Sequence, residues 1–121
     1  MGFFYSVRGW LELDNDHFQQ VCRIVNADED GIGHYASSWH FPAEGGGFSR
    51  FVFFGCTIRD SAVPSFRSQL ERITSTVVSH DGDLTDYVEG VFHVKPEDES
   101  AEFVWHLSSG CLVETNNLRS A

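Results

Sequence analysis

A run of acidic and amide side chains at residues 26–33, NADEDGIG, is the first candidate for chemistry in this chain. Its Asn, Asp and Gly residues follow the order in which the first half of an EF-hand loop places its calcium ligands and its tight turn. Such a loop needs a carboxylate at its last ligand position to close the oxygen shell, and Ser37 stands there. We therefore expect no calcium site. Asp28, Glu29 and Asp30 form either a solvated turn or a surface for a positively charged partner.

Histidine and cysteine offer the other common metal ligands, and the chain contains six and three of them. His93 and His106 face each other across a hairpin only if its register is favourable, and two imidazoles without a third ligand make a weak zinc site. We expect no metal and no cofactor. Cys22, Cys56 and Cys111 lack C-x-x-C spacing, which fits a reducing compartment, and we predict that all three are small buried apolar side chains.

Motifs for nucleophilic catalysis and phosphate binding do not occur in the sequence. No serine stands in G-x-S-x-G, and the glycines of EGGGFSR precede a strand-like run, whereas a phosphate loop opens a helix. Four acidic clusters fall at expected turns or element ends, where solvated carboxylates are normal. We predict no catalytic residues and no enzymatic activity.

Net charge is the strongest compositional signal. Eighteen acidic against eight basic side chains give a formal charge of -10. This charge repels phosphate backbones, so we expect no direct nucleic-acid binding, and it attracts cationic proteins. No apolar run approaches the roughly 18 residues that a membrane-spanning helix requires, and no secretory signal opens the chain. We expect a cytoplasmic protein that does not associate with membranes.

Strand-like and helix-like patterns alternate along the chain and must position these residues. We expect the whole chain, 1–121, to form a single domain. The predicted elements are a strand at 3–13, a helix from Asp14 or Asn15 to Val25, a hairpin of strands at 34–41 and 50–58, a helix from Pro64 to Val77, strands at 86–94 and 102–107, and a possible short strand in 111–121. Right-handed crossovers place both helices on one face of an antiparallel sheet. The expected fold is α+β, on the ferredoxin-like β-α-β-β-α-β plan with an extra C-terminal strand.

Large apolar side chains are expected on both faces of this sheet, although the two helices cover only one. Phe51 and Phe53 point away from the side of Phe54, and Trp10 points away from the side of Tyr5. The second face must be covered by the C-terminal segment, by a second copy of the chain or by a different protein. An exposed aromatic surface rimmed by acids would suit a basic partner.

Four segments spread over most of the chain, YSVRGWLELD, SWHFP, GFSRFVFFG and EFVWHL, carry a likeness of style and layout to a known group of proteins. In these segments, and in its small size and acidity, the chain resembles the immunity proteins of bacterial polymorphic-toxin and contact-dependent growth inhibition systems. The resemblance implies a cytoplasmic inhibitor that binds a cognate toxin domain, often a basic nuclease, and blocks its active site with acidic residues. No catalytic or binding residue carries over from it.

We therefore expect an immunity or inhibitor protein whose acidic turns meet a cationic toxin surface, with aromatic side chains as anchors. The predicted partner-binding residues are Asp28, Glu29, Asp30, Glu97, Asp98, Glu99, Glu102, Trp10 and Trp39. The alternative is a ferredoxin-like domain that binds a small ligand, or catalyses a reaction, as a homodimer formed through the open sheet face.

Overall fold

A computed structural model describes residues 3–27, 32–42, 49–80, 84–98 and 101–116 of the chain. Its elements, in chain order, are β1 (Phe4–Asp14), α1 (Asn15–Ala27), the 3-10 helix η1 (Ile32–Ser38), β2 (Trp39–His40), β3 (Ser49–Arg59), the 3-10 helix η2 (Asp60–Ala62), α2 (Val63–Thr74), β4 (Val77–His80), β5 (Leu84–Tyr87), β6 (Glu89–Pro96), β7 (Phe103–Ser108) and β8 (Cys111–Asn116).

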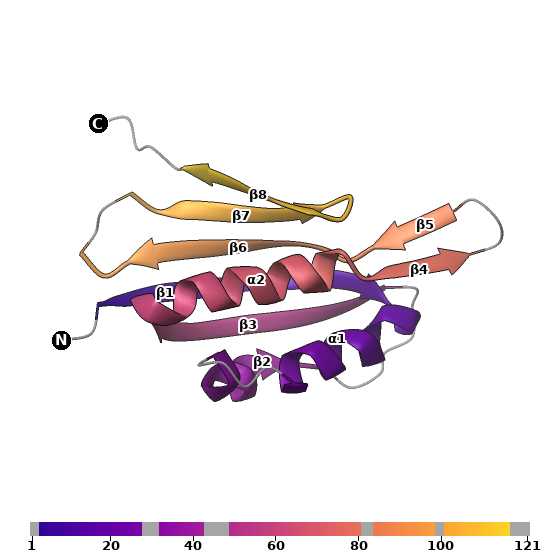
Figure 1. Cartoon of the computed structure of the whole chain (residues 1–121), viewed down its shortest axis with the longest axis horizontal. Coiled ribbons are helices and arrows are strands. Elements are labelled where there is room, and N and C mark those ends of the chain that lie inside the picture. The colour runs from indigo at the N-terminus through magenta and orange to yellow at the C-terminus, as the bar shows by residue number, and fades with distance from the viewer. Residues whose placement is uncertain (1–2, 28–31, 43–48, 81–83, 99–100, 117–121) are drawn as a thin grey trace.

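Six of the strands form one antiparallel sheet in the order β2-β3-β1-β6-β7-β8, and β4 pairs with β5 in a separate hairpin. Figure 1 shows α2 lying across one face of the sheet, with α1 beside it on the same side. The β2-β3-β1-β6 part has the strand order of the ferredoxin-like plan, and β7 and β8 extend it at the β6 edge. The predicted α+β fold is confirmed, with a second added strand where the sequence indicated a possible one.

The core lies between the sheet and α2. Phe66, Leu70 and Ile73 are fully buried, as the apolar stripe along this helix predicts. The Phe66 ring centroid lies 4.6 Å from that of Phe54 on β3 and 5.8 Å from that of Phe92 on β6. Aromatic rings therefore join the helix to two strands of the sheet, within a core that also contains many aliphatic side chains.

The strand expected at 34–41 is wrong over most of its length. Residues 32–38 form η1, and only Trp39 and His40 pair with β3. A 3-10 helix places residues three apart on the same side, so the buried Ile32 and the core-packed Tyr35 both face inward. The Tyr35 hydroxyl also accepts a hydrogen bond from the backbone N–H of Arg59 at 3.2 Å. These contacts favour the helical turn over an extended strand.

The second predicted helix also ends earlier than expected, at Thr74 instead of Val77, and Val77 begins β4. The expected strand at 86–94 is divided between β5 and β6, with Val88 in neither. The buried Thr74 hydroxyl donates a hydrogen bond to the Val88 carbonyl at 2.8 Å. This bond holds the Val88 carbonyl at the end of α2, at the point where the chain passes from one sheet to the other.

Candidate interaction surfaces

The strand registers decide which side chains stand together on the open face, the face of the sheet opposite α1 and α2. Residues paired directly across neighbouring strands point to the same side. One residue from each strand of the six-stranded sheet joins a continuous line, called here the cross-strand row, which consists of His40, Phe53, Trp10, Val91, His106 and Val113 in order from β2 to β8.

Large apolar side chains of the open face are exposed in or beside this row. Trp10 is 38% exposed, Phe51 44%, Phe53 46% and Val113 55%. The Trp10 and Phe51 rings meet edge to face, with centroids 6.1 Å apart. Alternation in the sequence indicated that Trp10, Phe51 and Phe53 lie on the second face, but only Trp10 was among the predicted partner-binding residues. Nothing in the sequence singled out Val113, because its place depends on the pairing of β8.

Charges on the open face are divided by the cross-strand row. Glu12 and Glu89 are direct partners on one side of it. Arg8 and His93 are direct partners on the other side, and Lys95 lies two residues beyond His93. The face is therefore acidic near the end of β1 and contains the basic side chains nearer its start.

Glu102, which precedes β7, partly offsets these basic side chains. Its Oε1 lies 3.8 Å from a guanidinium nitrogen of Arg8 and 3.4 Å from Nδ1 of His93. The carboxylate is only 24% exposed, whereas the Arg8 side chain is 62% exposed. Arg8 thus keeps most of its surface available for a further contact.

Glu97 and Asp98 follow β6 and are exposed, and with Glu102 they make up the described part of the acidic turn between β6 and β7. The backbone N–H of Phe4 donates to Oε1 of Glu97 at 3.1 Å, and the N–H of Glu97 donates to the carbonyl of Phe4 at 3.0 Å. This reciprocal pair fixes the start of the turn against the start of β1.

The structure brings the predicted partner-binding residues together only in part. Trp10 lies on the open face, about 20 Å along β1 from the acidic turn, judged from about 3.4 Å per residue. Trp39, the other predicted aromatic anchor, is 6% exposed and its ring centroid lies 5.0 Å from that of Phe54, so its side chain packs in the core and offers little surface to a partner. Four further predicted residues lie outside the described residues, namely Asp28, Glu29, Asp30 and Glu99.

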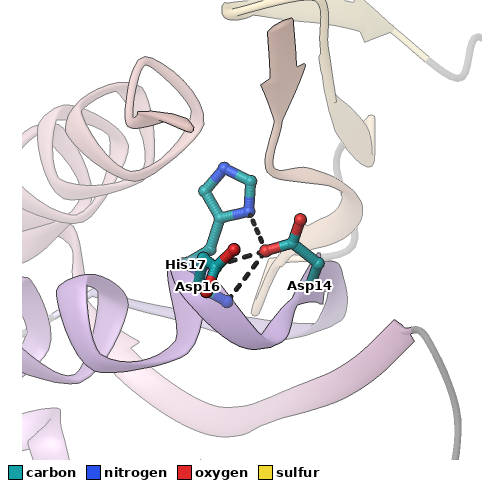
Figure 2. A network of polar contacts seen from close by, with 3 residues as sticks. All are labelled: Asp14, Asp16 and His17. Carbon is teal, nitrogen blue, oxygen red and sulfur yellow. Dashed lines mark hydrogen bonds and ion pairs between the residues drawn. The ribbon is translucent and has the colours of Figure 1, made fainter. Parts of the chain in front are cut away.

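A histidine and a carboxylate approach each other at the start of α1, in the combination that a general base would need. Figure 2 shows Oδ1 of Asp14 accepting from the backbone N–H groups of Asp16, at 2.9 Å, and His17, at 3.3 Å. The same oxygen lies 3.1 Å from Nδ1 of His17. Because the His17 side chain is only 1% exposed, a substrate has no access to it. The pair stabilises the helix start and is not a candidate active site.

Cysteine burial differs from the sequence prediction. Cys22 and Cys56 are partly buried, but Cys111 is exposed on β8, so the prediction for Cys111 is wrong. Burial raises the pKa of the Cys22 thiol, and the positive charge of Arg50 offsets part of this effect. Within the described ranges, no group of three or more His, Cys, Asp or Glu side chains could hold a metal ion.

Two hollows lie along the outer surface of α1, and both include Gln19 and Arg23 in their walls. Both are open to solvent. Ligand sites bury most of the ligand surface in a deep concave cavity, and these two open hollows do not provide that depth. The extended surfaces of the described residues are therefore better candidates than these two hollows.

Comparison with protein-family models, with curated proteins and with solved structures finds no match to this chain. Among the described helices, none has the length and apolar character needed to cross a membrane.

Proposed function

We propose that this protein is an immunity or inhibitor protein that binds and neutralises a cationic toxin domain, of the basic nuclease type, through its acidic turns. The observation that carries the proposal is the acidic turn, whose Glu97 is fixed to β1 through two hydrogen bonds with Phe4 in a chain of net charge -10. Glu97 and Asp98 remain exposed at the surface.

A carboxylate held in place before binding loses less side-chain entropy when a partner arrives than a freely rotating one. The surrounding negative field accelerates the encounter with a positively charged protein and disfavours acidic ones. Nucleases need basic surfaces to bind phosphate backbones, so an acidic surface can occupy the same site. The acidic turn and the negative net charge therefore suit an inhibitor that competes with a nucleic acid for the basic surface of a nuclease.

The first experiment tests protection. The C-terminal domain of the protein encoded immediately upstream of this gene is expressed in bacterial cells with and without this chain. We expect growth arrest with that domain alone and recovery when both proteins are present. Growth arrest that persists in the presence of this chain would contradict the proposal.

The second experiment locates the contact, with affinity measured by titration calorimetry on purified proteins. Replacing the two exposed charges of the acidic turn in a Glu97→Gln, Asp98→Asn variant is expected to weaken binding by about tenfold, corresponding to about 1.4 kcal/mol. Glu71→Gln, which removes an exposed charge from α2, is the matched control and should bind nearly as the wild type. Binding of the wild type should also weaken as NaCl rises. Equal losses for both variants would show that net charge alone, and not the acidic turn, is recognised.

A further inference from the structure

We propose that the open face is the interface of a symmetric homodimer, in which two sheets pack face to face about a twofold axis that runs along the cross-strand row. This inference concerns a surface that the proposed function does not use. A dimer of this kind leaves Glu97 and Asp98, which follow β6 and lie to one side of the row, exposed to another partner.

The first argument is the apolar content and size of the open face. Trp10, Phe51 and Phe53 expose 38–46% of their surfaces on neighbouring central strands. The paired stretches of the six strands, at about 3.4 Å per residue and about 4.8 Å between strands, cover about 500 Å² in projection. Side chains that stand out from the sheet add to this projected area, so the accessible surface is of the same order as the roughly 800 Å² that stable interfaces bury per partner.

The second argument is the distribution of charge, which favours a second copy over other occupants. A twofold axis along the row reverses the strand direction of one copy relative to the other, so the acidic side of one face lies over the basic side of its partner. Glu12, two residues after Trp10, then stands over Arg8 of the other copy, two residues before its Trp10. An isologous interface requires this self-complementarity. An axis parallel to the strands would instead place acid over acid.

The third argument is steric. Phe51 and Gly55 lie at equal distances on either side of Phe53 on β3, and both point to the open face. A Cβ atom added to Gly55 would meet nothing within 4 Å, so Gly55 leaves a notch on this face. The same twofold axis places Phe51 of each copy over Gly55 of the other. A large ring therefore meets an open site on both sides of the axis.

Two sheets that pack face to face cross at an angle of up to about 30°. Side chains of the two copies therefore stay opposite each other best near the centre of the interface. β1 and β3 are central or next to central in the sheet order, and they supply both the Glu12–Arg8 and the Phe51–Gly55 pairs. The geometry thus makes its most specific contacts where the twist of the sheets matters least.

A charge-swap cycle tests this geometry by sedimentation equilibrium of the full chain over a range of concentrations. We expect the wild type to have twice the mass of one chain. Glu12→Arg and Arg8→Glu should each weaken the dimer by about tenfold or more, because each places like charges opposite each other. The double variant should recover to within about threefold of the wild type, since both contacts are restored with their signs reversed.

Recovery in the double variant cannot arise within one chain. Residues 8 and 12 are about 13 Å apart along the same strand, beyond the range of a direct ion pair. Arg8→Glu also repels Glu102 in its own chain, so circular dichroism must show that each variant is folded.

Gly55→Arg supplies an independent test that removes no member of an existing ion pair, although the new guanidinium stands beside Arg8, its direct partner on β1. A Cβ atom at this position meets nothing within 4 Å, and a long side chain can extend from the open face into solvent, so we expect a folded monomer. Glu71→Arg, on the far side of the molecule, adds the same side chain as a control and should remain dimeric. A wild type that is monomeric at about 100 μM would overturn the proposal, as would a dimer unaffected by Gly55→Arg or a double swap without recovery.

Discussion

At the scale of single residues, Asp14 connects the first strand to the first helix. Its Oδ1 accepts hydrogen bonds from two backbone N–H groups that the first turn of α1 cannot satisfy internally. The same oxygen lies beside Nδ1 of the buried His17, and a buried polar ring is tolerated only where its nitrogen atoms have polar neighbours. The carboxylate thus serves helix capping and histidine burial together (Figure 2).

We predict that Asp14→Ala lowers the free energy of unfolding by about 1–2 kcal/mol, the usual effect of losing a helix cap. Asp14→Asn keeps an oxygen acceptor for the backbone N–H groups, so its loss should be smaller. Urea denaturation followed by circular dichroism measures both. Asp16→Ala removes a neighbouring carboxylate of the same first turn that does not cap the helix, and an equal loss in this control would contradict the capping role.

At the scale of elements, two glycines on adjacent central strands have opposite surroundings. A Cβ atom on Gly9 of β1 would lie 2.3 Å from the Val91 carbonyl oxygen and 2.5 Å from the Phe92 ring. Gly9 therefore allows β6 and its buried phenylalanine to approach β1 closely. Gly55 of β3 faces open space on the other side of the sheet.

We predict that Gly9→Ala is strongly destabilising, by about 2 kcal/mol or more, because a clash with backbone cannot be relieved by a rotamer change. Gly55→Ala is the matched control, since alanine suits a strand better than glycine and meets no neighbour there, so its stability should be unchanged or slightly higher. Thermal unfolding of the two variants in parallel tests the pair. Similar losses in both would show that the close approach at Gly9 is not what requires glycine.

At the scale of the whole molecule, the charge of -10 opposes compaction by self-repulsion. The open face differs from this overall character, because Arg8, Lys95 and Arg59 stand there against Glu12, Glu89 and Glu102. Because acidic and basic side chains balance on this one face, it is suited to self-association. The acidic turn, in contrast, carries the negative charge that suits a cationic partner.

We predict that raising the salt from about 10 mM to about 100 mM increases the melting temperature by about 4 °C, because the Debye length falls from about 30 Å to about 10 Å and self-repulsion is screened. NaCl and KCl should act equally in calorimetry. A melting temperature that falls with salt would show that attractive ion pairs outweigh the repulsion, and a difference between the two salts would indicate specific ion binding.

Local patterns in the sequence were sufficient to predict much of the fold. The stripe of Phe66, Leu70 and Ile73 identifies the buried side of α2, and alternation along β1 and β3 identifies Trp10 and Phe53 as side chains of the second face. Both properties repeat over a few residues, so they follow from the geometry of a helix or a strand without knowledge of what packs nearby. The order of such elements then leads to the ferredoxin-like plan.

Tertiary structure alone decided where these elements meet. Trp39 lies in the core and Trp10 on the surface, because the pairing of β2 with β3 places Trp39 opposite Phe54 on the side of the helices, where its ring also meets Phe66. The cross-strand row exists only because the strand registers align residues far apart in the chain, and register is a property of pairs of strands. Periodicity along one segment carries no information about how two strands are aligned with each other. Which residues share the open face is therefore determined only by contacts between residues far apart in the chain.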